Sequence, residues 1–451
     1  MQPLDDLTLD AVIVLPGIMG SELYDVQADR QIWGFRDPRW YGEAWRNPET
    51  LSRLALDDNE RAGAYGRVRA TNVLQIPAFA PMLRGFEPYR VLLDRIGQMV
   101  LPGALRVFPY DWRLPVAHNA RLLADDATRH LADWRRRGHP QARLVLVGHS
   151  MGGLVARHWI DVLGGADDVR TTVTLGTPFG GAVKAAEILA AGRGVPGFRT
   201  RRLRTALRSV SVTMPGVYDL LPTGPVVVLG DERMRELSAV DIVDIGGDRD
   251  LAEDARRRRP ASGWTDHALR TVVGTGQTTA QNLRIVAGEV RTSVRALRRG
   301  RDGTVVEVDR SGDATVARDA ASPVAQAHCY LAQTHGGLPA SAEVAHHVAN
   351  ILSETPLTQP LGLPEPGLDL PDVVPAGTEF AFRVTGVEHP RDAAAWFGPV
   401  DGRTGPLPLP AHFRDGEVWV SVPPCRPGLH RVAVRGVTEL VLVDAAENEQ
   451  G

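Results

Sequence analysis

The sequence of 451 residues predicts an α/β fold in which helices cover both faces of a mostly parallel sheet. Short runs that are almost entirely apolar alternate along the chain with segments whose apolar residues recur at a helical period. Such runs are typical of strands buried on both faces, because strands facing water on one side alternate polar with apolar residues. One run also ends in the pattern Gly-x-Ser-x-Gly, which marks a sharp turn from a strand into a helix.

The expected strands of this sheet and the helices between them follow one another in order. The strands are predicted at residues 11–15, 105–108, 144–147 and 169–175. Helices are predicted at residues 119–137, 154–163 and 340–352, and further apolar segments lie at 269–274, 283–287 and 304–308. The alternation breaks at residues 185–265, which we interpret as a cap inserted into the fold.

Length and composition predict two domains, because one hydrophobic core rarely serves more than about 300 residues. Residues 1–355 form the expected α/β domain, with a lid at about 30–60. Prolines crowd residues 356–375, which we interpret as a semi-rigid linker. Residues 376–451 predict a small all-β domain, an immunoglobulin-like sandwich of antiparallel strands. Its strands are expected at residues 378–385, 417–422, 429–435 and 438–443.

Charge and cysteine content narrow the class of protein. A net charge of −3 gives no reason to expect a nucleic-acid partner. Two cysteines, Cys329 and Cys425, are too few for a disulfide framework, which fits a reducing compartment. The amino terminus is acidic where a signal peptide is basic, and no run approaches the about 20 apolar residues of a membrane span. We therefore expect a cytoplasmic protein.

The segment GHSMG at residues 148–152 predicts a nucleophilic serine. An apolar strand precedes it and a helical segment follows it, which is the setting of a nucleophile elbow. Glycines flank the serine because the turn is strained and leaves no room for side chains. This nominates Ser150 Oγ as the reacting atom; a solvated turn serine is the plainer alternative.

A serine nucleophile needs an acid and a base, which in this kind of fold follow it in the order Asp or Glu, then His. Asp313, in the segment GDATV, is the preferred acid, since it is expected at a strand end before a tight turn. Asp302 and Asp231 are weaker candidates, and Asp313 itself has the alternative role of capping its own turn.

His335, in the segment THGGL before the last predicted helix, is the preferred base. The alternatives are His328, His346 and His347, of which the last two fall inside that helix. Histidine and cysteine do not cluster at metal-ligand spacing, so neither a metal nor another cofactor is expected.

Two backbone amides are expected to bind the oxyanion that develops on the substrate. One is that of Met151, directly after the nucleophile, and the other is that of Ile18, in the loop after the first strand.

These pieces together resemble the lecithin:cholesterol acyltransferase family of α/β-hydrolases, which includes lysosomal phospholipase A2 and phospholipid:diacylglycerol acyltransferases. The resemblance implies that Ser150, Asp313 and His335 are the catalytic triad and that Ile18 and Met151 form the oxyanion hole. Secreted members pin a lid with a disulfide, for which this chain has no cysteine, and the β domain lies outside the resemblance. The matching motifs are PGIMGS at 16–21, FPYDWR at 108–113, GHSMGG at 148–153, LGTPFGG at 175–181, VYDLLP at 217–222, GDATV at 312–316, and His335.

The segment at about residues 30–60 is rich in aromatic side chains that suit a boundary between water and lipid. In the family this region forms a lid or a membrane-contacting part, and a small aromatic core under a long loop is an equal alternative. The candidate substrate-contacting residues are Trp33, Phe35, Trp40, Tyr41 and Trp45.

Arginines in the cap suggest contact with anionic groups. Residues 193–208 carry six arginines among apolar residues, which predicts either a membrane-facing stretch or a solvated helix face. The run at 256–259 is expected to be an exposed loop. By contrast, Asp111 and Arg113 are expected to form a buried ion pair without a catalytic role.

The sequence therefore predicts a serine-dependent lipid ester hydrolase or O-acyltransferase that works through an acyl-Ser150 intermediate. A carboxylesterase or amidase for soluble substrates is the first alternative. The second is an interaction protein whose hydrolase domain is recruited to a protein partner through the β domain. If the protein is a lipid ester hydrolase or O-acyltransferase, we also expect peripheral contact with a membrane through the lid and the cap.

Overall fold

A six-stranded sheet, parallel throughout, forms the centre of the computed structural model. Its strands stand in the order β15, β10, β7, β6, β1, β5, and each neighbouring pair is parallel. They are β1 Ala11–Leu15, β5 Leu105–Val107, β6 Leu144–His149, β7 Val169–Leu175, β10 Leu269–Gly274 and β15 Cys329–Leu331. The structure describes residues 7–34, 48–74, 89–193, 201–230, 233–261, 263–265, 267–299, 305–308, 311–323, 329–354, 366–371, 373–387, 389–400, 405–434 and 437–444.

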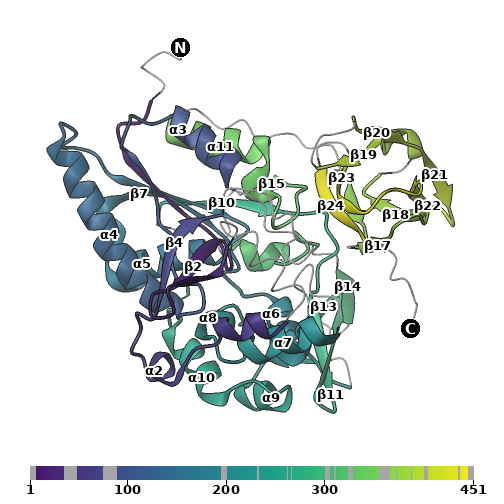
Figure 1. The fold of residues 1–451 in the computed structure, drawn as a ribbon, viewed down its shortest axis with the longest axis horizontal. Helices are drawn as coiled ribbons and strands as arrows, with labels where there is room; N and C mark the ends of the chain where they lie inside the picture. The colour runs from purple at the N-terminus through teal and green to yellow at the C-terminus, as the bar shows by residue number, and fades with distance from the viewer. Residues whose placement is uncertain are drawn as a thin grey trace.

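Helices cover both faces of this sheet, which confirms the predicted α/β-hydrolase fold (Figure 1). On one face lie α3 Arg90–Gln98 and α11 Ala342–Leu352, and on the other lie α4 Val116–Arg136 and α5 Met151–Leu163. The strands β1, β6 and β7 are buried along nearly their whole length, as their apolar sequences require. Helix α4 begins before the predicted residue 119, directly after Pro115, because proline fits only the start of a helix.

A small antiparallel sheet that the sequence did not predict lies beside the central one. Its strands stand in the order β3 Arg30–Trp33, β2 Ser21–Asp25, β4 Val68–Val73. Two short helices, η2 Pro48–Leu54 and α2 Asp58–Arg61, lie between β3 and β4 in the chain. Trp33 belongs to this part and is fully buried, with its ring edge against Trp112. The other aromatic lid candidates, Phe35, Trp40, Tyr41 and Trp45, lie outside the described residues.

Helices and a second sheet follow β7 in the chain; they include the predicted cap at residues 185–265 and extend beyond it, past β10. The helices are α6 Val183–Ala191, α7 Arg201–Ser211, α8 Pro215–Tyr218, α9 Ala239–Asp244 and α10 Arg249–Arg258. The sheet has the order β12 Glu289–Ser293, β11 Asn282–Val286, β8 Pro225–Val228, β9 Met234–Glu236, and β13 Ala296–Arg299 pairs with β14 Val305–Val308 beside it.

The expectation of an exposed loop at residues 256–259 is wrong. Three of these arginines form the last turn of α10, and Arg258 binds Asp219 at 2.9 Å. Arg259 donates to the carbonyls of Asp219 and Leu221, and its burial lowers its pKa to about 10. The run thus fastens α10 to the end of α8.

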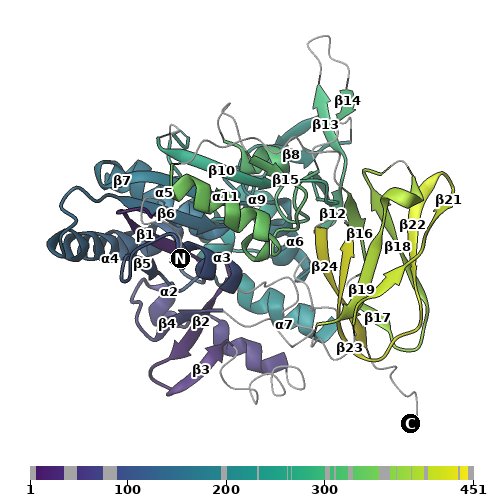
Figure 2. The same ribbon diagram turned by 90° about the horizontal axis from the view of Figure 1, so that it is seen from above.

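The carboxy-terminal part is a sandwich of two sheets around its own core, which Figure 2 shows beside the α/β domain. One sheet has the order β16 Gly367–Asp369, β18 Phe380–Thr385, β22 Glu417–Val422, β21 Ala411–Arg414. The other has the order β17 Val373–Pro375, β24 Val437–Asp444, β23 Gly428–Val434, β19 Ala395–Pro399, β20 Leu407–Leu409.

Two details of the sandwich correct the sequence analysis. Gly367–Asp369 and Val373–Pro375, expected in the linker, form strands β16 and β17. Pro375 is tolerated there because β17 is the edge strand of its sheet. Strand β17 is also parallel to β24, whereas antiparallel pairing alone was expected.

The predicted ion pair between Asp111 and Arg113 is confirmed. The guanidinium of Arg113 is buried and lies 2.7 Å from Asp111 Oδ2. Sequence reasoning missed its second partner, Glu60 of α2, whose Oε1 is also at 2.7 Å. Glu60 Oε2 binds Arg67 at 2.7 Å, so the network joins the small antiparallel sheet to the loop after β5.

Candidate active site

Ser150 stands on a strained turn between β6 and α5. Its φ of 51° and ψ of −124° lie where residues with a side chain are rarely found. The Ser150 amide donates to the carbonyl of Leu175 at 2.8 Å, and Thr177 Oγ1 donates to the Ser150 carbonyl at 3.0 Å. A Cβ on Gly152 would lie 2.4 Å from the Pro16 carbonyl oxygen, so only glycine lets the end of β1 approach this closely. The turn therefore fixes the hydroxyl at the carboxyl edge of the sheet.

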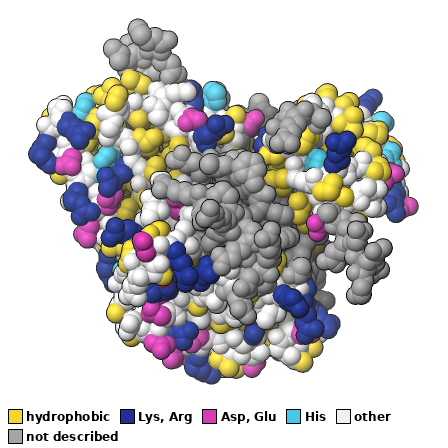
Figure 3. Space-filling view, viewed as in Figure 1, with side chains coloured by type: hydrophobic (Ala, Val, Ile, Leu, Met, Phe, Trp, Pro, Cys, Tyr) yellow, Lys and Arg dark blue, Asp and Glu magenta, His cyan; other side chains and the backbone are white. Residues whose placement is uncertain are grey.

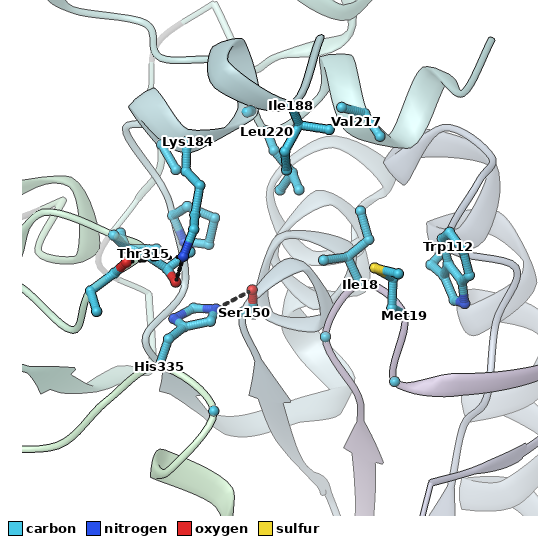
Figure 4. A pocket seen from close by; sticks show the side chains of 18 of the residues that line it. Ile18, Met19, Trp112, Ser150, Lys184, Ile188, Val217, Leu220, Thr315 and His335 are labelled. Carbon is cyan, nitrogen blue, oxygen red and sulfur yellow. Dashed lines mark hydrogen bonds between the residues drawn. The ribbon is translucent and has the colours of Figure 1, made fainter. Parts of the chain in front are cut away.

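The structure brings Ser150, His335 and Asp313 into one hydrogen-bonded chain. Ser150 Oγ lies 2.8 Å from His335 Nε2, and His335 Nδ1 lies 2.7 Å from Asp313 Oδ2 (Figure 4). A carboxylate only accepts hydrogen bonds, so Nδ1 donates to it and Nε2 is left to accept the serine proton. This is the arrangement that a general base and its orienting acid need.

Asp313 is held by its own turn and is almost fully buried. Its Oδ1 accepts the amides of Thr315 at 3.0 Å and Val316 at 2.7 Å, and its carbonyl accepts the amide of His335 at 2.7 Å. In the described residues 311–323, Asp313 forms an isolated bridge with Gln277 and begins the expected tight turn, in which its amide donates to the Val316 carbonyl at 3.2 Å. Its carboxylate is at the sheet edge, since the turn packs directly on Gly274 at the end of β10.

The two predicted oxyanion donors flank Ser150. Met151 is the first residue of α5, and the first amides of a helix have no acceptor within it. Ile18 lies in the loop after β1 and lines the space in front of Ser150 (Figure 4). The loop is pressed against the nucleophile, because a Cβ on Gly17 would lie 3.0 Å from Ser150 Cβ. Their role as donors stays a prediction.

A buried hydrogen-bond chain joins this loop to His335, and sequence reasoning missed it. The Tyr89 hydroxyl accepts the Gly17 amide at 2.8 Å and lies 2.7 Å from His149 Nδ1. His149 Nε2 lies 2.9 Å from the His335 carbonyl, which can only accept, so Nε2 donates and Nδ1 accepts from Tyr89. Burial lowers the pKa of His149 to about 3, so the ring stays neutral in this tautomer.

Replacing Tyr89 by Phe should weaken both stability and turnover. The change leaves the Gly17 amide and His149 Nδ1 buried without partners, each at a cost of about 1–3 kcal/mol in the free energy of unfolding. Without the hydrogen bond to the Tyr89 hydroxyl, the loop that carries Gly17 and Ile18 should shift. Because the predicted oxyanion donor Ile18 shifts with it, we expect kcat to fall by about 10- to 100-fold. Urea unfolding and hydrolysis of p-nitrophenyl acetate measure the two effects, with Tyr65→Phe, outside the network, as the control. Wild-type values in Tyr89→Phe would show that the chain has no positioning role.

Ser150 opens into a cleft of about 780 Å³ whose two sides differ in chemistry. Figure 4 shows Ile18, Met19, Trp112 and Val217 on one side of Ser150. Trp33, the last residue of β3, also lines the cleft. Its indole N–H donates to the Met19 carbonyl at 2.8 Å. It is thus part of the wall of the cleft and of the core beneath it.

Cationic residues of the cap line the same cleft. Lys184 Nζ, on the other side of Ser150 in Figure 4, donates to the Ala314 carbonyl and to Thr315 Oγ1, both at 3.0 Å. Of the 51 lysine and arginine residues of the chain it is the only lysine, and this rarity is a signal in the sequence that the predictions did not use. Arg193 and Arg204 also line the cleft.

The rest of the predicted arginine-rich stretch has mixed roles. Arg208 donates to the carbonyls of Leu189 and Ile245 and therefore fastens neighbouring helices. Arg201 and Arg202 are exposed on α7, while Arg199 lies outside the described residues. On the face shown in Figure 3, basic and acidic side chains are interspersed over the α/β domain. Among the described residues, no helix is long and apolar enough to cross a membrane.

Of the alternative acids and bases, His346 and His347 are described, and neither lines the cleft. His346 and His347 lie on α11, and burial lowers the pKa of His347. Asp231, Asp302 and His328 lie outside the described residues.

Comparison of the sequence with known families finds a match in the first half of the chain and just beyond it. The family model "lecithin:cholesterol acyltransferase" matches residues 89–284, which include the elbow, Lys184 and the predicted cap at residues 185–265. The predicted resemblance is thereby confirmed for this part, which is less than half of the chain. No curated protein sequence matches the chain.

Comparison with solved structures gives matches at low sequence identity. The Tle4–Tli4 complex contains a chain with a TM-score of 0.50 and 17% identity, and the match covers 76% of this chain and 98% of that one. The lipase BlEst2 of Bacillus licheniformis, in its propeptide form, has a TM-score of 0.29 and 13% identity over 97% of this chain and 74% of its own. The phospholipase PlaB of Legionella pneumophila has a TM-score of 0.29 and 12% identity over 98% of this chain and 97% of its own. At 17% identity, the similarity to the chain in the Tle4–Tli4 complex shows a shared fold and nothing more.

Proposed function

We propose that this chain, whose residues 89–284 match the lecithin:cholesterol acyltransferase family, is a lipid ester hydrolase or O-acyltransferase that works through an acyl-Ser150 intermediate. The observation that carries the proposal is the hydrogen-bonded chain from Asp313 through His335 to Ser150, at the floor of a large and largely apolar cleft. The family match supports the ester-cleaving or acyl-transferring class of reaction.

The first half-reaction transfers the acyl group to the enzyme. His335 Nε2 takes the proton from Ser150 Oγ as the oxygen attacks the acyl carbonyl carbon, and the Ile18 and Met151 amides bind the resulting oxyanion. The ester C–O bond then breaks, and the alcohol leaves with the proton from His335. Asp313 keeps the imidazole oriented and stabilises its charged form throughout.

The second half-reaction returns the enzyme to its starting state. Water or a second alcohol gives its proton to His335 Nε2 and attacks the acyl carbon. The bond from that carbon to Ser150 Oγ then breaks, Oγ takes the proton back from His335, and an acid or a new ester is released. The proposal includes both outcomes, because they differ only in which acceptor reaches the acyl-enzyme first.

The lining of the cleft supports a lipid substrate with an anionic group. The apolar side formed around Met19 and Trp112 suits an acyl chain, and the cationic residues Lys184, Arg193 and Arg204 suit a phosphate. We therefore favour phospholipid over neutral soluble esters. Membrane contact through the lid and α7, and protein recruitment through the β-sandwich, stay predictions.

Incubation with mixed phospholipid and alcohol acceptors, followed by lipid extraction, tests the proposal. We expect fatty acid or a new acyl ester to appear with wild-type protein and not with Ser150→Ala. Hydrolysis of short p-nitrophenyl esters with no product from vesicles would favour the soluble carboxylesterase or amidase instead. The ratio of free acid to new ester reports how hydrolysis competes with transfer.

A further inference from the structure

The wall of the cleft is not built by the α/β domain alone. Thr438, Glu439 and Leu440 of strand β24 line the same cleft as Ser150 and His335. They belong to the carboxy-terminal β-sandwich, about a hundred residues further along the chain than the base. The sandwich therefore borders the space in which a substrate would lie.

Strand β24 directs one row of side chains into the core of the sandwich and the other row away from it. Val437, Val441 and Val443 are at most 1% exposed and belong to the core of the sandwich. Side chains alternate between the two faces of a strand, so Thr438 and Leu440 lie on the face opposite to these valines. Both are half-buried. They are thus available to the cleft without disturbing the core of their own domain.

The sandwich is docked tightly next to the catalytic acid. A Cβ on Gly367 of β16 would lie 1.8 Å from the Gly276 carbonyl oxygen, so the two backbones are in direct contact. The amide of Leu368 donates to Gln277 Oε1 at 3.4 Å, and the amide of Gln277 donates to the Gly312 carbonyl at 2.9 Å, next to Asp313.

A second contact lies close to the base. Ala332, three residues before His335, packs into the hydrophobic core of the sandwich. The domain is thus fixed relative to the site through the segments that carry both the acid and the base. The part of the cleft wall that β24 forms therefore has a defined position relative to these segments.

We propose that the β-sandwich is part of the substrate site, and that Thr438 and Leu440 form an outer wall that contacts the alkyl part of the substrate. This rests on the proposed function, in that the cleft takes an ester with a long acyl chain. A cleft of about 780 Å³ is far larger than an acetyl ester needs. A short ester can react at Ser150 among its immediate neighbours Gly17, His149 and His335, whereas a long chain must extend to the outer walls.

Leu440→Trp tests the wall by filling it. We expect kcat/KM for p-nitrophenyl laurate to fall by about ten-fold, because small changes of volume in an apolar pocket change rates on this scale. For p-nitrophenyl acetate we expect a change within about two-fold, since the reacting groups are untouched. Thr438→Trp is the second variant, and thermal unfolding checks that each variant is folded.

Leu407→Trp is the matched control. Leu407 lies in the same sheet, on β20, is 47% exposed and does not line the cleft. A fall in the laurate-to-acetate ratio in either wall variant, absent from the control, supports the wall. An unchanged ratio in all variants would overturn it while leaving the proposed function intact. Wild-type protein that cleaves both esters but no phospholipid would instead count against the proposed lipid substrate, and the ratio would still judge the wall.

Discussion

Ser150→Ala should lower kcat on every ester substrate by at least about 10⁴-fold, because no acyl-enzyme can form without the attacking oxygen. The hydroxyl lies 2.8 Å from His335 Nε2 on a backbone that adopts a strained conformation to present it. The same change should abolish covalent labelling by a fluorophosphonate, which reacts with an activated serine. Gel detection of the labelled protein and hydrolysis of p-nitrophenyl acetate measure both effects.

Ser209→Ala is the matched control for the nucleophile. Ser209 is exposed on α7 and does not line the cleft, so its removal should leave labelling and turnover unchanged. Labelling that survives in Ser150→Ala would move the nucleophile to another residue and would remove the basis of the proposed mechanism.

Asp313→Asn should lower kcat by about 10⁴-fold while leaving the fold in place. Asp313 Oδ2 accepts the Nδ1 proton of His335 at 2.7 Å, and Oδ1 accepts two amides of its own turn. An amide nitrogen facing His335 would favour the tautomer that carries the proton on Nε2, and that ring cannot accept the serine proton. Steady-state kinetics at saturating ester measures the loss.

Asp319→Asn, an exposed position a few residues further along the chain, is the control for this second substitution. Its kcat should stay at the wild-type value. A loss smaller than about ten-fold in Asp313→Asn would mean that another group orients His335, since an orienting carboxylate is worth far more than that.

Most of the correct predictions came from patterns among neighbouring residues in the sequence. The strands β1, β6 and β7 are apolar throughout, and the elbow stands between a strand and a helix, so the fold and the position of Ser150 follow from neighbouring residues. The sequence also supplied Asp313 and His335 as candidates, because their order along the chain is a property of the fold.

Contacts between distant segments could not be predicted in the same way. Tyr89 reaches Gly17 and His149 from 72 and 60 residues away, and nothing in its local sequence distinguishes it from any other tyrosine. Gln277 is similar, since its link to Leu368 exists only once the two domains are docked. The same holds for the turn at Asp313, whose isolated bridge joins it to Gln277, 36 residues earlier in the chain.

The solitary lysine has a practical consequence. Lys184 is held beside Ser150 by two hydrogen bonds, and the chain contains no other lysine side chain. Among the side chains, amine-directed chemistry would therefore address one position, inside the cleft. Cleavage by a lysine-specific protease would divide the unfolded chain once, after residue 184. The reactivity of the Lys184 amine toward such a reagent therefore reports on this one cleft. Protection of the amine shows that the cleft is folded, and additional protection when a ligand is added shows that the cleft is occupied.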